Sequence, residues 1–188
     1  MRSRKTSFVI ITTAASVSLF LFAGVPFGRA IQWRSSLYKC VVELPDASPQ
    51  INPWAPMSSA GEEDETGMVG VTGAHRIDQS AYVFLGVIRL DKNPKFQLND
   101  KTLPELEKRY FGSGLGFRHS LEPLRRKDGL PGYRLTGTHQ YRGAKYNLVL
   151  DIVQGNNMIY EIAGLSLGPQ PLKEPDIRSF MESFRLTR

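Results

Sequence analysis

The clearest hydrophobic pattern lies in the last third of the chain. Polar and apolar residues alternate over positions 133–141, and apolar residues recur at every second position over 146–152 and again over 158–162. A period of two residues is typical of a half-buried strand. The dipeptides Arg142-Gly143 and Gly155-Asn156 separate the three segments, and both contain residues that tolerate the positive φ of a tight turn. The pattern therefore predicts a three-stranded antiparallel meander.

Three further strands are predicted in the first half of the chain. They cover residues 38–44, 68–76 and 81–90, and the last of these is apolar on both of its faces. Such a strand belongs inside a sheet that is covered on both sides. Residues 45–66 are rich in Pro, Ser, Asn and acidic side chains, which predicts a long acidic loop. Trp54 within this loop is expected to close one end of the core.

Two helices are predicted from apolar residues spaced three and four positions apart. Leu103, Leu106 and Tyr110 would share one face of the first helix, which Gly112 would end. The second helix would begin near Pro175. Its apolar face is formed by Ile177, Phe180, Met181 and Phe184. The predicted fold class is α+β, with an antiparallel sheet of about six strands covered by helices.

The N-terminus has the three regions of an export signal. Residues 1–7 are basic, residues 8–25 carry no charge, and Gly28-Arg29-Ala30 places small residues before a possible cleavage site. Two interpretations stay open for residues 1–30. They form either a signal peptide that is cleaved after Ala30 or an N-terminal apolar helix that anchors the chain in the cytoplasmic membrane. Under the positive-inside rule both interpretations place the domain on the periplasmic, extracytoplasmic side.

Charge and composition narrow the class of function. The chain has 188 residues, of which 41% are hydrophobic, and a single cysteine, which excludes an intramolecular disulfide framework. The net charge is +6, but four of the 24 basic residues and none of the 18 acidic ones lie in residues 1–30, which leaves +2 for the remainder. A nucleic-acid-binding domain carries its basic stripe on the folded part, so no nucleic-acid partner is predicted.

The predicted organisation is one domain with an N-terminal extension. Residues 31–37 are expected to form a linker, and residues 38–188 a single α+β domain that includes the acidic loop at 45–66. No internal repeat is visible. The sequence does not determine the oligomeric state.

The order of elements resembles the PsbP/Mog1 superfamily of α/β/α sandwiches, including its small exported bacterial members. The resemblance rests on a first strand that ends in Leu44-Pro45, a loop with Trp54, the hairpin strand 146–150, the strand Met158-Ile159-Tyr160-Glu161-Ile162, and a closing helix with Ser183-Phe184. It implies an accessory or binding module, because plant members support photosystem II and the Mog1 member binds a small GTPase. None of the functional residues of those members has a counterpart identified in this chain.

Two groups of residues are candidates for binding. The first is the most polar predicted strand, which contributes Arg134, Thr136, Thr138, His139, Gln140 and Tyr141. It is a binding surface if no helix covers it, and otherwise an ordinary solvated strand. The second is the basic patch Arg125-Arg126-Lys127, which suits an acidic protein partner or the phosphates of a membrane surface.

Catalytic chemistry has little support in the sequence. His75, His119 and His139 match no metal-ligand spacing, although each would lie near a strand end, so a joint metal site is one alternative. Asp151 and Glu161 are expected to face solvent from their strands and so to form no catalytic pair. We predict no catalytic residue, metal or cofactor.

The function predicted is an exported or membrane-anchored, non-catalytic binding or accessory domain with a protein partner or a membrane surface. Two alternatives are kept, a small hydrolase or metal-dependent enzyme that uses the three histidines, and a structural envelope protein.

Overall fold

The computed structural model describes residues 30–45, 53–57, 67–91, 98–99, 101–112 and 114–187. The predicted signal or anchor, up to residue 29, and the acidic run at residues 62–65 lie outside the described residues. Among the helices of the described part, none is both long and apolar enough to cross a membrane.

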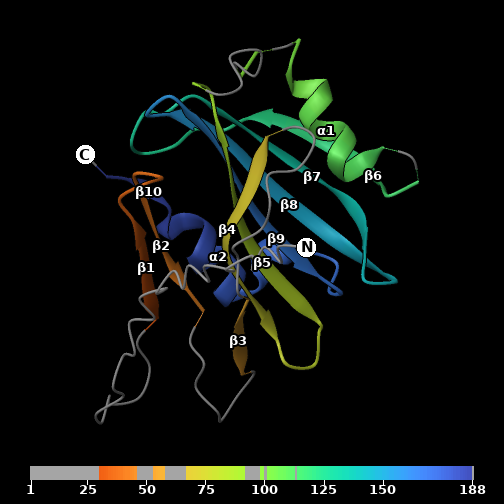
Figure 1. The fold of residues 1–188 in the computed structure, drawn as a ribbon. Coiled ribbons are helices and arrows are strands. Elements are labelled where there is room, and N and C mark those ends of the chain that lie inside the picture. Colours follow the sequence, from red (N-terminus) through yellow and green to blue (C-terminus); the bar gives the residue numbers. More distant parts are fainter. Residues whose placement is uncertain are drawn as a thin grey trace, which may run out of the picture.

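A seven-stranded sheet forms the centre of the fold (Figure 1). Its strands lie in the order β3-β4-β5-β9-β8-β7-β6, and each pair of neighbours is antiparallel. The strands are β3 (Trp54–Met57), β4 (Met68–Arg76), β5 (Ala81–Arg89), β6 (Gly116–Pro123), β7 (Gly132–Tyr141), β8 (Ala144–Gly155) and β9 (Met158–Ser166). The predicted meander is β7, β8 and β9. Every residue of β9 is buried, because neighbouring strands and both covering layers enclose it.

A second, three-stranded sheet was not predicted. It consists of β1 (Ile31–Ser35), β2 (Cys40–Leu44) and β10 (Arg185–Leu186), in the order β1-β2-β10. Most of the segment expected to be a linker, residues 31–37, is therefore the strand β1, which pairs antiparallel with β2 from Ile31 to Ser35. Its side chains are exposed or half-buried, so the hydrophobic pattern that marks a buried strand is missing from it.

Two helices cover the two faces of the large sheet. Helix α1 (Leu103–Phe111) packs near β6 and β7, and α2 (Pro175–Ser183) packs against β5 and β9 and against β2 of the small sheet. Figure 1 shows α2 between the small orange sheet and the large sheet, with the green α1 at the other end of the molecule. We call the two sides of the large sheet the α1 face and the α2 face. Each carries its own hydrophobic cluster.

The hydrophobic pattern of the sequence does not predict either edge strand of the large sheet. Strand β3 lies inside the expected loop, and β6 follows the first helix where no strand was expected. In β6 every residue is exposed or half-buried, and a β-bulge between Arg118 and Ser120 interrupts the alternation. An edge strand with these properties lacks the period of two that reveals a strand.

Trp54 fixes the start of α2 to the edge of the sheet. Its indole is 3% exposed, and its Nε1 donates a hydrogen bond of 3.1 Å to Asp176 Oδ2 in α2. The Arg76 guanidinium lies 5.4 Å from the centroid of the Trp54 ring and forms an ion pair of 2.6 Å with Glu174. The expectation that Trp54 closes one end of the core is confirmed.

The buried thiol of Cys40 should make the fold less stable at alkaline pH. Its side chain is fully buried, and burial raises the pKa of the thiol from 9.0 to about 12. The unfolded thiol loses its proton above its ordinary pKa while the folded thiol keeps it, so the folding equilibrium constant should fall as the pH rises from about 9 to 12, up to about tenfold per pH unit. Urea unfolding followed at pH 8 and pH 10.5 measures this loss.

The matched variant is Cys40→Val, which removes the thiol and keeps an apolar side chain. We expect it to lose less stability between the two pH values than the natural chain. The burial-raised pKa of Tyr160 acts in the same direction and stays in both proteins. Equal losses in both proteins would show that Cys40 plays no part.

Candidate functional site

The outer strands of the large sheet carry polar side chains on the α2 face. Because pairs across the strands point to the same side, the register aligns them in rows. Glu122, Arg134 and Asp151 form one row, and Ser120 lies opposite Thr136 in the next. Helix α2 packs against β5 and β9, so this part of the sheet lies beyond the strands that it covers. We call it the polar face, formed by Ser120, Glu122, Arg134, Thr136, Thr138, Asn147 and Asp151.

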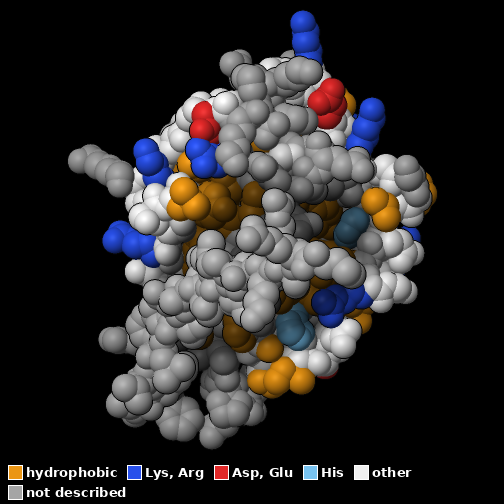
Figure 2. Space-filling view, in the orientation of Figure 1, with side chains coloured by type: hydrophobic (Ala, Val, Ile, Leu, Met, Phe, Trp, Pro, Cys, Tyr) orange, Lys and Arg blue, Asp and Glu red, His pale blue; other side chains and the backbone are white. Residues whose placement is uncertain are grey.

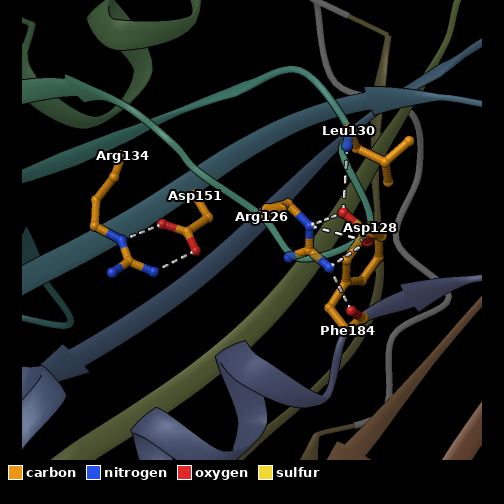
Figure 3. A network of polar contacts seen from close by, with 6 residues as sticks. All are labelled: Arg126, Asp128, Leu130, Arg134, Asp151 and Phe184. Atoms are coloured by element: carbon orange, nitrogen blue, oxygen red, sulfur yellow. Dashed lines mark hydrogen bonds and ion pairs between the residues drawn. The ribbon is translucent and has the colours of Figure 1, made fainter.

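Arg134 and Asp151 form the strongest contact on the polar face (Figure 3). Arg134 Nε and Nη2 each donate a hydrogen bond of 2.7 Å, one to each carboxylate oxygen of Asp151. The Asp151 side chain is only 2% exposed, whereas that of Arg134 is 31% exposed. The hydrogen bonds to Asp151 raise the pKa of Arg134, against the effect of its own partial burial. Arg134 thus neutralises a buried charge.

The loop between β6 and β7 is held by Arg126. Its Nε and Nη2 donate to the two oxygens of Asp128, and Nη2 also donates a hydrogen bond of 2.6 Å to the carbonyl oxygen of Phe184, just after α2 (Figure 3). The guanidinium lies 5.1 Å from the centroid of the Phe184 ring. The hydrogen bond from Arg126 lowers the pKa of Asp128. Arg125 and Lys127, on either side, are exposed.

Two hollows flank the polar face. One of about 470 Å³ is lined by Arg134 and Asp151, the loop residues 124–128 and the end of α2. It brings together Arg134 and the basic patch, which are separate candidates in the sequence. The other, of about 290 Å³, is lined by His119, Thr136 and Asn147 together with residues 169–172. A polar surface bounded by hollows at both ends can bind an extended polar group.

The six candidate residues of β7 do not form one site, because successive side chains of a strand point to opposite faces. Arg134, Thr136 and Thr138 belong to the polar face. His139 and Tyr141 lie on the α1 face, where they line an apolar cavity of about 360 Å³. Gln140, next to the turn, is exposed.

The three histidines do not converge. His119 lines a hollow on the α2 face, whereas His75 stacks on Tyr82 of the α1 face cluster and His139 lies beside Tyr110. His75 on β4 and His139 on β7 are separated by β5, β9 and β8, and four strand spacings amount to about 19 Å. Within the described residues no three His, Cys, Asp or Glu side chains are grouped to hold a metal ion.

The structure contradicts the expectation for two acidic residues. Asp151 and Glu161 were expected to face solvent, but they are 2% and 1% exposed. They lie on opposite faces of the sheet, because Glu161 lies opposite Ile152, the neighbour of Asp151. The signal for their burial was present in the sequence, since each interrupts a continuous apolar segment. A charge at such a position is buried only with a partner.

Comparisons with solved structures give the fold of this chain. Cyanobacterial PsbP (CyanoP) from Synechocystis sp. PCC 6803 is 12% identical to this chain and has a TM-score of 0.53. The match covers 89% of this chain and 98% of the CyanoP chain. The chain therefore has a PsbP-like fold, as the sequence resemblance predicted. LpqN, described as involved in cell envelope biogenesis of Mycobacterium tuberculosis, is 12% identical with a TM-score of 0.41. That match covers 79% of this chain and 83% of the LpqN chain.

A Pseudomonas aeruginosa protein of unknown function, described as a putative regulator, is 13% identical, with a TM-score of 0.44, and covers 86% of this chain and 99% of its own. No protein-family model matches the sequence. No curated protein matches it either.

Proposed function

We propose that this chain is a non-catalytic accessory domain that binds a protein partner through the polar face. The observation that carries the proposal is the row arrangement on β6, β7 and β8. Beyond the strands that α2 covers, it leaves Ser120, Glu122, Arg134 and Thr136 exposed or half-buried on a rigid sheet. Sites built on strands hold their side chains more precisely than sites on loops. The PsbP-like fold agrees with an accessory role, but it identifies no partner.

The basic end of the polar face favours an acidic partner. Arg126 and Arg134 are each paired with an aspartate, so their charges are largely neutralised. Arg125 and Lys127 are exposed beside the same hollow and add positive charge at its rim. Charges at the rim of an interface act mainly on the association rate and on the choice of partner. An acidic segment that lies along the polar face would end at this rim.

Export is part of the proposal. The basic, apolar and small-residue regions of residues 1–30 support a location outside the cytoplasm, reached with or without cleavage after Ala30. Mass spectrometry of the chain isolated from the source cells distinguishes the two cases by the residue at its N-terminus. Recovery of the intact chain from the cytosol alone would contradict export.

The test of the binding face uses a charge reversal with a matched control. Arg125→Glu with Lys127→Glu alters the rim of the polar face, and Lys101→Glu with Lys108→Glu makes the same change in charge at exposed positions at and near α1. A photoreactive amino acid at His119, which is exposed at the hollow beside Thr136 of the polar face, captures the partner in intact cells. We expect the captured adduct to decrease about tenfold in the first double variant and to stay unchanged in the second.

Two results would contradict the proposed binding face. Equal decreases in the two double variants would show that only net charge matters and that the polar face is not the binding site. An adduct that forms from a photoreactive residue at Lys108, and not from His119, would move the interface to α1. Circular dichroism of both variants confirms that the exposed substitutions leave the fold intact.

A further inference from the structure

The α1 face holds a cavity of a different character from the polar face. Its volume of about 360 Å³ lies within the range of small-molecule sites, which are mostly apolar with a few polar groups. Methionine and aromatic side chains contribute much of its lining. Those that form the apolar wall include Met57, Met68, Phe84, Tyr141 and Leu165. Figure 2 shows hydrophobic side chains gathered near the centre of the molecule in this view.

Glycines in β4 and β5 make room for this cavity. Gly70 lies opposite Gly86, and Gly73 lies opposite Phe84, so three positions that would carry a side chain toward the cavity carry none. A Cβ atom at Gly86 would meet the sulfur of Met68 at 2.7 Å. At Gly70 it would meet no atom of the described residues within 4 Å. Gly70 is exposed at the rim of the cavity, and no described residue fills the space next to it.

A polar group lies at one side of the apolar lining. The Tyr110 hydroxyl donates a hydrogen bond of 2.7 Å to Glu161 Oε2, and both residues line the cavity. Glu161 is 1% exposed and comes from β9, the most buried strand. An ionised carboxylate only accepts hydrogen bonds, and its two oxygens offer about four acceptor positions, so Glu161 can accept from a bound molecule in addition to Tyr110.

His139 adds a second acceptor to the same cavity. Its Nδ1 lies 2.9 Å from the carbonyl oxygen of Tyr110. A carbonyl only accepts hydrogen bonds, so Nδ1 must be the nitrogen that carries the proton. In the neutral imidazole the other nitrogen, Nε2, is then an acceptor. The polar groups contributed by Glu161 and His139 are therefore of one kind.

We propose that this cavity binds an aliphatic molecule that ends in a hydrogen-bond donor, a hydroxyl or an amino group. The aliphatic part occupies the space beside Gly70, between the methionines and Phe84. The terminal group donates to the acceptors formed by Glu161 and His139. A ligand that ends in a carboxylate is disfavoured, because it would place a second anion beside a buried one. This site lies on the opposite face from the proposed partner site and is independent of it.

The test compares decanol, decylamine and decanoate, which share one chain length and differ in the terminal group. Binding to the full chain is measured by isothermal titration calorimetry, below the concentrations at which the probes form micelles. We expect decanol and decylamine to bind with one site per chain and decanoate to bind at least about tenfold more weakly, because mismatched buried polar groups are strongly rejected. Equal affinity for decanoate, or no binding of any probe, would overturn the proposal.

Gly70 supplies the matched pair of variants. Gly70→Leu places a side chain in the open space and should weaken decanol at least about tenfold, whereas Gly70→Ala adds one methyl group and should retain binding. The backbone there needs no positive φ, so neither variant is strained. Unchanged decanol affinity in Gly70→Leu would place the bound molecule elsewhere.

Glu161→Gln then tests the terminal group. The amide keeps the size of the side chain, removes its charge and adds a donor. We expect decylamine to weaken more than decanol, and decanoate to gain relative to both. An unchanged order among the three probes would show that Glu161 does not contact the terminal group. Thermal unfolding of Glu161→Gln, compared with the natural chain, confirms that the variant folds.

Discussion

Replacing Arg134 with alanine should lower the free energy of unfolding by about 3 kcal/mol. The reason is the partner that the substitution leaves behind. Asp151 is 2% exposed and receives two hydrogen bonds of 2.7 Å from the guanidinium. Without them its carboxylate remains as a buried charge, and removing one member of a buried ion pair costs more than the pair contributes. Urea unfolding at neutral pH measures the loss.

Two further proteins make this result specific. Arg118→Ala removes an arginine whose side chain is 43% exposed and which pairs with Glu107, so it should cost less than about 1 kcal/mol. Arg134→Met combined with Asp151→Leu removes both charges and should recover most of the stability, since an apolar pair of similar size replaces the ion pair. If Arg134→Ala were as stable as the natural chain, Arg134 would have no role in stability, and its role would be limited to binding.

Replacing Phe180 with alanine should destabilise the fold by about 4 kcal/mol, within the range measured for large aromatic residues in cores. Phe180 is fully buried on α2, in the hydrophobic cluster between the large and small sheets. Its removal leaves a cavity in the layer that joins the helix to both sheets, and the surrounding strands cannot close it. Calorimetric or urea unfolding would show the change.

The matched control is the same substitution at Phe117. This phenylalanine on β6 is 70% exposed, so Phe117→Ala should change stability by no more than about 0.5 kcal/mol. A loss at Phe180 as small as that at Phe117 would mean that α2 contributes little to the stability of the core. The protein would then have to be held together by the large sheet alone.

Much of the fold was predictable because its central strands and helices are amphipathic or wholly apolar. The meander β7–β9, the covered strand β5 and the apolar face of α2 follow from the period of their hydrophobic residues. The edges were not predictable. Strands β1 and β6 bury little and β3 buries only Trp54, and their pairing comes from a neighbouring strand rather than from their own sequence.

The candidate sites show the same division. The alternation in β7 already separated Arg134 and Thr136 from His139, although their closeness in the chain suggested a single site. The pairing of Arg134 with Asp151 depends on the register between β7 and β8, and the approach of Arg126 to Phe184 depends on where α2 ends. The local sequence predicts neither contact.

The sequence by itself determined the class of the molecule: an α+β domain with a buried meander and a closing helix. Local periodicity and composition encode these properties because they depend on neighbours within one element. Only the tertiary structure decided which faces the side chains share. It buried Asp151 and Glu161, separated the three histidines, and left a polar surface on one side of the sheet and an apolar cavity on the other. Strand register and helix packing fix these distances, because they join residues that are far apart in the chain.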